Sequence, residues 1–255
     1  RNRTYIQEVQ KEIGNTIKVQ GFIENLRNSK YMAFIVLKDI TGKLQITVEK
    51  EDHPELVDTI DRLTPDSVIT VTGKVMENDY VKMGGIEMIP ESIEIESIAD
   101  ALPIVRKEIA ATKKKKAVER SSIDQRIDYR WIDLRTDANQ LMFKAQTTMI
   151  NAMRQFLLER SFMEIHTPKL IGAASESGAD VFEVKYFDRK AYLAQSPQFY
   201  KQMMVGVFER VYEIAPVFRA EKHDTARHLN EYTSLDFEMG YIDSCLLYTS
   251  DAADE

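Results

Sequence analysis

The first hundred residues alternate between hydrophobic and polar positions in short runs, the pattern of half-buried β-strands. Apolar residues recur at every second position in five stretches, which are Ile17–Ile23, Ala33–Leu37, Leu44–Val48, Val68–Gly73 and Ile93–Ser97. Turn-forming residues separate them, as at Asp39–Gly42 and at Gly84 and Gly85. A helical pattern over about 54–63 follows the third stretch. Five strands with a helix between the third and fourth predict an all-β OB-fold barrel, a frequent binder of single-stranded nucleic acid.

Beyond the barrel the hydrophobic period changes. Residues 101–137 show little periodicity and are predicted to be a linker or hinge. Its Lys113–Lys116 run is either a solvated face or a contact to a nucleic-acid backbone. A long amphipathic helix is predicted from about Ala138 to Glu159. Its apolar stripe is predicted to lie in the core and comprises Met142, Ala145, Met149, Met153, Phe156 and Leu157.

A strand pair followed by a helix start comes next. Val181–Phe187 and Ala191–Gln195 have strand patterns. Ser196 is predicted as the N-cap of a helix, with Pro197 at the first helical position. Gln198 and Lys201 then share one helix face, because they are three positions apart. An amide and a cation at a helix start can together hold a carboxylate.

The stretch Phe218–Glu238 is predicted to form a strand, a polar loop and a second strand. In the second strand Thr233, Leu235, Phe237 and Met239 point to one face, and Ser234, Asp236 and Glu238 point to the other. A sheet face that carries acids, next to Arg219 and Arg227, suits a ligand with both anionic and cationic groups. ATP together with an amino acid is such a pair of ligands.

Three segments resemble the aspartyl-tRNA synthetases of class II, in their archaeal and eukaryotic-like form. Phe218–Glu238 is similar to motif 2, Arg160–Pro168 to motif 1, and Gln195–Gln202 to the helix that recognises aspartate. The resemblance covers nearly all of residues 1–243. It implies an α+β protein in which the barrel precedes part of a class II antiparallel sheet flanked by helices. The implied domains are an anticodon-binding barrel at 1–100, a hinge at 101–137 and the N-terminal part of the catalytic domain at 138–244.

The resemblance also implies roles for individual residues in the catalytic segment. Arg219 would be catalytic, bridging the substrate carboxylate and the α-phosphate of ATP. The aspartate-binding residues would be Glu176, Gln198, Lys201, Arg219 and Asp236. The ATP-binding residues would be Arg219, Ala220, Glu221, Arg227, His228 and Leu229. Pro168 would lie in the interface of a homodimer.

In the barrel, Phe34 and Gln45 are out of phase with the core positions beside them, so both should face outward. An aromatic ring next to an amide can stack on a splayed base and read its edge. The resemblance implies that Arg27, Phe34 and Gln45 bind the anticodon. The implied partners are tRNA(Asp), L-aspartate and ATP. Whether tRNA(Asn) is charged as well stays open, because some members of this type charge both.

Two other functions compete with this interpretation. An asparaginyl-tRNA synthetase has less need of Lys201, because a cation is poorly paired against a neutral carboxamide. Motif 2 of the asparaginyl enzymes also usually lacks the Thr-x-Leu-Asp sequence found at Thr233–Asp236. A non-catalytic tRNA- or protein-binding relative would not need Arg219, Glu221, Arg227 and Asp236 together.

Composition limits the remaining possibilities. The net charge is −7, so a nucleic-acid partner must be bound by local basic surface. No apolar run reaches the ~20 residues of a membrane helix, and no apolar signal core is present at residues 1–5, so a cytoplasmic protein without a membrane partner is expected. Residues 245–255, with the single cysteine Cys245, look like a translated sequencing adapter and are expected to be a non-native tail.

The resemblance further implies that motif 3 should lie beyond residue 244. The second ATP-binding arginine and the acid that holds Mg²⁺ belong to that region, so no metal ligands are expected within the chain as printed. We therefore expect the chain alone to be inactive.

Overall fold

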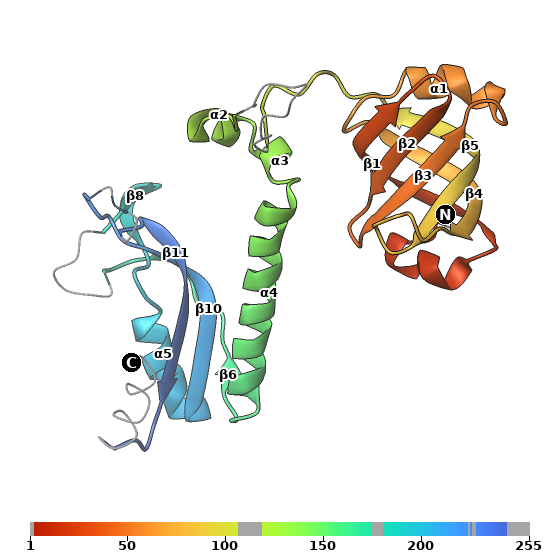
Figure 1. Cartoon of the computed structure of the whole chain (residues 1–255). Coiled ribbons are helices and arrows are strands. Elements are labelled where there is room, and N and C mark those ends of the chain that lie inside the picture. Colours follow the sequence, from red (N-terminus) through yellow and green to blue (C-terminus); the bar gives the residue numbers. More distant parts are fainter. Residues whose placement is uncertain (1–2, 107–118, 175–180, 224, 226–227, 244–255) are drawn as a thin grey trace. The chain divides into compact units, whose positions relative to one another are not determined.

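The computed structural model describes residues 3–106, 119–174, 181–223, 225 and 228–243. The chain divides into two compact units, Arg1–Leu134 and Arg135–Glu255 (Figure 1). The predicted residues Glu176 and Arg227, the Lys113–Lys116 run and the predicted tail lie outside the described residues. Each unit is considered by itself.

The first unit contains a closed five-stranded barrel. Its strands are β1 (Thr16–Asn28), β2 (Met32–Lys38), β3 (Lys43–Glu49), β4 (Val68–Glu77) and β5 (Ile86–Ser97), in the order β1-β2-β3-β5-β4. A 3₁₀ helix, η1 (Ile6–Glu12), precedes the barrel, and η2 (Pro54–Leu56) with α1 (Val57–Asp61) lies between β3 and β4. The barrel closes because β3 pairs with β5 in parallel while the other pairs are antiparallel. The predicted OB-fold is confirmed.

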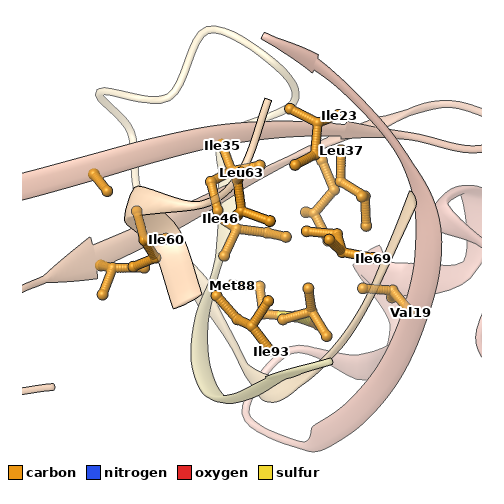
Figure 2. Packing of buried hydrophobic residues seen from close by; sticks show 14 of the residues in the cluster. Val19, Ile23, Ile35, Leu37, Ile46, Ile60, Leu63, Ile69, Met88 and Ile93 are labelled. Carbon is orange, nitrogen blue, oxygen red and sulfur yellow. The ribbon is translucent and has the colours of Figure 1, made fainter. Parts of the chain in front are cut away.

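Strand alternation fills the barrel interior. Along β2, Ala33, Ile35 and Leu37 are fully buried, and Figure 2 shows the side chains of Ile35 and Leu37 packed with those of neighbouring strands. Among the residues that the structure describes, nineteen buried side chains form this core. A large aliphatic side chain contributes roughly 1.5–3 kcal/mol when fully buried, so this core dominates the stability of the unit.

Two glycines allow neighbouring strands to approach closely. A Cβ atom on Gly21 of β1 would lie 2.3 Å from the carbonyl oxygen of Lys38. A Cβ atom on Gly73 of β4 would lie 2.3 Å from the carbonyl oxygen of Ile89. Any side chain at these positions would clash with backbone, so both glycines are required by the curvature of β1 and β4.

The described parts of the predicted linker have structure that its weak periodicity did not suggest. Arg106 forms a two-pronged ion pair with the buried Asp66, at 3.1 and 2.6 Å, which ties the start of the linker to the barrel. Two short helices follow, α2 (Ile123–Asp128) and α3 (Arg130–Asp133).

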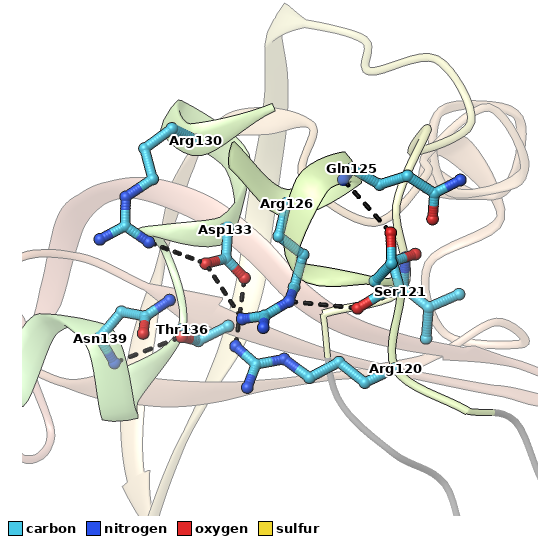
Figure 3. Close-up of polar contacts among 10 residues, drawn as sticks. Arg120, Ser121, Gln125, Arg126, Arg130, Asp133, Thr136 and Asn139 are labelled. Atoms are coloured by element: carbon cyan, nitrogen blue, oxygen red, sulfur yellow. Dashed lines mark hydrogen bonds and ion pairs between the residues drawn. The ribbon is translucent and has the colours of Figure 1, made fainter. Parts of the chain in front are cut away.

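A fully buried carboxylate organises these two helices. The Asp133 carboxylate forms ion pairs with three guanidinium groups, those of Arg120 at 3.3 Å, Arg126 at 3.6 Å and Arg130 at 3.1 Å (Figure 3). A buried charge of this kind is tolerated because cations surround it. At least one role of the three arginines is therefore structural, since they neutralise the buried Asp133 carboxylate.

The second unit is built on two small sheets. The first has the order β11-β10-β6, and the second β7-β9-β8. The elements are α4 (Asp137–Leu158), β6 (Met163–Glu164), β7 (Leu170–Ile171), β8 (Glu183–Tyr186), β9 (Arg189–Leu193), α5 (Gln198–Phe208), β10 (Arg210–Phe218) and β11 (Glu231–Met239). The predicted strand, loop and strand at Phe218–Glu238 are present as the end of β10, the loop and β11.

The buried stripe predicted for α4 is wrong. Met142 is 57% exposed, and Met149 and Phe156 are each 54% exposed. The C-terminal end of α4 does contribute to the core, because Leu157 packs with Phe162 and the buried Tyr212 of β10. Periodicity correctly identified an amphipathic helix but could not show that little of the described chain covers its apolar face.

Polar contacts fix the same end of α4. Arg154 makes two-pronged hydrogen bonds to the Glu164 carboxylate of β6, and the Tyr212 hydroxyl donates to it at 2.9 Å. The hydrogen bond from Arg154 is the main reason that the pKa of Glu164 lies below its ordinary 4.5. Among the described residues, no helix combines the length and apolarity that a membrane crossing requires.

Candidate functional site

The three predicted barrel residues lie on neighbouring strands of one outer face. Phe34 of β2 pairs with Arg27 of β1 on one side and with Thr47 of β3 on the other. Two residues further along the β2–β3 pair, Gln45 of β3 pairs with Val36 of β2, and on its other side it pairs with Glu87 of β5. Arg27 is exposed, and it has no ion-pair partner among the described residues. Phe34 and Gln45 are half-buried.

A polar network that the sequence did not reveal supports Gln45. Its amide nitrogen donates to the Thr47 hydroxyl at 3.1 Å and more weakly to the Glu87 carboxylate at 3.4 Å. Thr47 also donates to Glu87, and Asn78 donates to the other carboxylate oxygen at 2.7 Å. Thr47 and Glu87 are buried although they lie on the outer face. Gln45 and Glu87 are 42 positions apart, so the only available signal was the outward phase of Thr47.

In the second unit, helix α5 and strand β11 bring two predicted residues together. The Lys201 ammonium lies 2.6 Å from the Asp236 carboxylate and 3.2 Å from that of Glu238. Burial alone would lower the pKa of Lys201, but the hydrogen bonds and charges of Asp236 and Glu238 outweigh it and raise the pKa above 10.5. The cation is therefore permanently charged at neutral pH, between two acids.

A third acid lies directly across the sheet from Asp236. Glu213 of β10 is directly opposite Asp236 in the register and is 3% exposed. It accepts hydrogen bonds from the backbone and hydroxyl of Thr167 and from Lys169, whose ammonium is 2.7 Å away. These bonds hold the exposed Pro168 between Thr167 and Lys169 beside the sheet.

Arg219 follows the last residue of β10. Its guanidinium carbon is 5.8 Å from the centre of the Tyr232 ring, and its Nε is buried with no hydrogen-bond partner among the described residues. It is not in contact with the Lys201 cluster. The register places Phe218 opposite Glu231 and Glu213 opposite Asp236, five residues apart, which corresponds to roughly 17 Å along a strand. The register therefore places Arg219 and the Lys201 cluster at different points along the β10–β11 strand pair.

The backbone of Ala194 links the strands around this site. Its N–H donates to the Lys169 carbonyl, and its carbonyl accepts from the Phe218 N–H. Gln195 and Ser196 are thereby placed near the end of β10.

The predicted cap of α5 is wrong by one residue. The helix begins at Gln198 with Pro197 as N-cap, and the buried Ser196 hydroxyl has no hydrogen-bond partner among the described residues. Proline cannot donate, but its carbonyl accepts the first helical hydrogen bonds, from Tyr200 and Lys201. Gln198 is half-buried on the same helix as Lys201.

The predicted nucleotide-binding loop is described only in part. Ala220 and Glu221 are half-buried, and the Glu221 N–H donates to the Arg219 carbonyl at 2.8 Å. His228 and Leu229 are exposed, and the His228 ring lies 2.6 Å from the Thr225 hydroxyl. Within the ranges that the structure describes, no group of three or more His, Cys, Asp or Glu side chains is placed to hold a metal ion.

Comparison with known proteins connects these sites. Residues 122–249, half of the chain, match the family described as "tRNA synthetases class II (D, K and N)". The chain belongs to the class II tRNA synthetases of this group. Residues 17–96 match "OB-fold nucleic acid binding domain", which agrees with the closed barrel.

Similar proteins support both units of this synthetase chain. It is 44% identical over 91% of its length to an aspartate–tRNA(Asp/Asn) ligase of Methanopyrus kandleri, and 43% identical over 89% to an aspartate–tRNA(Asp) ligase of Picrophilus torridus. It spans 52% of each, about half the length of these curated relatives.

Solved structures of synthetases have the same fold. An asparaginyl-tRNA synthetase from Pyrococcus horikoshii with asparaginyl-adenylate matches 98% of the chain and 56% of that structure, with a TM-score of 0.87 and 29% identity. An aspartyl-tRNA synthetase from Entamoeba histolytica matches 99% and 53%, with a TM-score of 0.78 and 28% identity.

Proposed function

We propose that the complete protein is an aspartate–tRNA ligase, and that this chain carries its anticodon reader and part of its aspartate and ATP sites. The observation that carries the proposal is the contact between Lys201 and Asp236, 2.6 Å apart on α5 and β11. An amino acid with a negatively charged side chain needs a cation to bind its side-chain carboxylate and an acid to bind its α-ammonium group. These two side chains provide both within one site.

In the proposed reaction, an oxygen of the α-carboxylate of aspartate attacks the α-phosphorus of ATP. Pyrophosphate leaves with the electrons of the broken P–O bond, and aspartyl-adenylate forms. A terminal ribose hydroxyl of tRNA then attacks the carbonyl carbon, loses its proton and displaces AMP. Arg219 would stabilise the charge that develops on the phosphate, because its Nε has no hydrogen-bond partner within the described part of the chain and could donate to a phosphate oxygen.

The same contact favours aspartate over asparagine. Replacing the substrate carboxylate by a carboxamide would remove the charge attraction between the substrate side chain and the Lys201 ammonium in this half-buried site. The asparaginyl alternative has a supporting observation, the TM-score of 0.87, but the fold is shared by both kinds of enzyme. The curated relatives named above are aspartate–tRNA ligases.

The proposed partners are tRNA(Asp), with tRNA(Asn) as a possible second substrate, and a second copy of the complete protein. The exposed Pro168 beside the sheet edge is the proposed position of the dimer contact. Mg²⁺ would accompany ATP, and a cytoplasmic site of action belongs to the same proposal.

The test is ATP–pyrophosphate exchange by the complete protein with aspartate or asparagine as the only amino acid. Exchange with aspartate should be much faster, and exchange that is faster with asparagine would overturn the assignment. Charging of purified tRNA(Asp) and tRNA(Asn) then decides the second substrate. The printed chain alone should give no detectable exchange.

A further inference from the structure

A buried carboxylate joins the two sheets of the second unit, and the proposed reaction does not use it. Glu213 of β10 is 3% exposed. It accepts hydrogen bonds from the Thr167 backbone at 2.6 Å, from the Thr167 hydroxyl at 2.8 Å and from the Lys169 ammonium at 2.7 Å. Lys169 directly precedes β7 of the other sheet. The ion pair between Glu213 and Lys169 therefore links one sheet to the other.

The backbone closes this link into a ring of contacts. The N–H of Ala194, directly after β9, donates to the Lys169 carbonyl at 2.9 Å, and the Ala194 carbonyl accepts from the Phe218 N–H at 2.9 Å. Phe218 is the last residue of β10, the strand that also carries Glu213. The two sheets are thus linked twice along β10, by the side chain of Glu213 and, five residues later, by the backbone of Phe218.

Arg219 is the residue that follows this ring. Its backbone N–H donates to the Asn230 carbonyl at 3.0 Å. Its side chain lies 5.8 Å from the centre of the Tyr232 ring, and its Nε has no hydrogen-bond partner in the described part of the chain. The position of the guanidinium therefore depends chiefly on the backbone at the end of β10.

The chemistry of the buried pair indicates a geometric role. A buried ion pair adds little stability compared with apolar residues of similar volume, but it requires a fixed arrangement of its two groups. The fixed contact between Glu213 and Lys169 determines where the Lys169 carbonyl lies, and that carbonyl determines where Ala194 can meet Phe218. A displacement of about 1 Å in a catalytic group can lower a rate by about 100-fold.

We propose that Glu213 is a positioning residue for Arg219. Acting through Lys169 and Ala194, it fixes the end of β10, so that the Arg219 guanidinium lies at the α-phosphate when ATP is bound. Glu213 touches neither substrate in this arrangement. The inference rests on the proposed function, in which Arg219 stabilises the charge that develops on this phosphate.

The experiment is a double-mutant cycle in the complete protein, measured by ATP–pyrophosphate exchange with aspartate. Glu213→Gln should lower kcat by about 30-fold and change the KM for aspartate by less than about threefold, because a carboxamide cannot form the ion pair with Lys169. Arg219→Lys alone should lower kcat by about 100-fold. With Arg219→Lys present, Glu213→Gln should lower kcat by less than about threefold further, because the group that it positions is already gone.

Glu164 provides a matched control on the same sheet. It is a half-buried carboxylate on β6, next to β10, and it accepts hydrogen bonds from Arg154 and from the Tyr212 hydroxyl. Its hydrogen bonds in the described part of the chain do not reach Lys169 or Ala194. Glu164→Gln should therefore change kcat by less than about threefold, although it also removes the charge partner of a cation.

Lys169→Gln breaks the same link from the other side and should reproduce the loss of kcat. A wild-type kcat in this variant would overturn the proposal, whatever the stability of Glu213→Gln. Equal losses from Glu213→Gln with and without Arg219 would also overturn it, because a general structural effect would multiply with the loss of Arg219.

Two further outcomes separate this inference from the proposed function. A higher KM for aspartate at unchanged kcat in Glu213→Gln would assign the residue to substrate binding and overturn the positioning role. A wild-type protein without aspartate-dependent exchange would overturn the proposed function itself.

Discussion

The barrel and the second unit differ in how much of their apolar surface they bury. The barrel closes on itself, and within the described ranges nineteen buried residues form the core of the barrel and the helices beside it, whereas the buried cluster of the second unit contains three, namely Leu157, Phe162 and Tyr212. Leu141 and Met142 of α4 and Phe237 of β11 remain largely or partly exposed. The barrel should therefore be stable by itself, while the second unit has an incompletely covered sheet and helix.

The largest expected effect comes from removing the same side chain from each unit. Leu37 is fully buried in the barrel, and Leu141 is 65% exposed on α4. Leu37→Ala should lower the opening free energy of the slowest-exchanging barrel amides by about 3 kcal/mol, from lost burial and a cavity. Leu141→Ala should change the stability of its own unit by less than about 0.5 kcal/mol.

Hydrogen exchange of both variants measures this difference. If Leu141→Ala lowers stability as much as Leu37→Ala does, the outer face of α4 is covered in solution. The proposed difference in buried apolar surface between the two units would then be wrong.

A second prediction assigns aspartate binding to the second unit. In the complete protein, Lys201→Ala should raise the KM for aspartate in pyrophosphate exchange by about 100-fold and that for ATP by less than about threefold, because a half-buried charge partner is lost. Lys190→Ala is the control, since its ion pair with Glu183 is exposed. Equal losses for aspartate and ATP would exclude a role of Lys201 in reading the substrate side chain.

A third prediction assigns RNA binding to the barrel. Phe34→Ala should weaken binding of the printed chain to a labelled anticodon hairpin RNA by about tenfold, through loss of one stacking contact. Phe22→Ala is the matched control, because Phe22 lies on the barrel opposite Lys38, at the other end of β2. Unchanged binding by the Phe34 variant would show that the ring packs within the barrel and does not contact RNA.

The smallest expected effect is a difference between the units at alkaline pH. The pKa of Lys201 is raised in the folded chain, so its contribution to stability is complete below pH 10.5 and is lost as the pH rises through the raised pKa. Because solvent screens part of this cluster, the loss should be of the order of 1 kcal/mol. Thermal unfolding between pH 9 and 12 measures it.

Lys201→Met provides the reference for this titration, since it has no group that titrates at this position. Its profile should lack the alkaline step of the second unit. A step of the same size in both proteins would have to come from another group.

The two units also differ in how well sequence patterns predicted them. Alternation placed all five barrel strands, because strands of a closed barrel have one face inside and one outside. The strand–loop–strand around Arg219 and the outward phase of Phe34 and Gln45 were found in the same way. The network of Thr47 and Glu87 could not be found, because it depends on a parallel pairing between distant strands.

The errors in the second unit have physical causes as well. Periodicity showed that α4 has an apolar stripe, but burial depends on what lies against it, as Met149 and Phe156 demonstrate. Ser196 is a residue type that favours the N-cap, yet the backbone starts the helix one residue later, and its hydroxyl has no hydrogen-bond partner in the described part of the chain. The distance between Arg219 and Asp236 depends on strand register, which no local pattern gives.

The close approaches at Gly21 and Gly73 have a consequence for how this barrel can change. Both positions lie on β1 and β4, whereas Phe34, Gln45 and Glu87 lie on β2, β3 and β5. Mutations of Phe34 or Gln45, the residues that we propose to contact the base, therefore need not disturb the strands that bend to close the cylinder. Such an arrangement lets recognition of the nucleic acid diverge, in nature or by design, while the architecture beneath it stays constant.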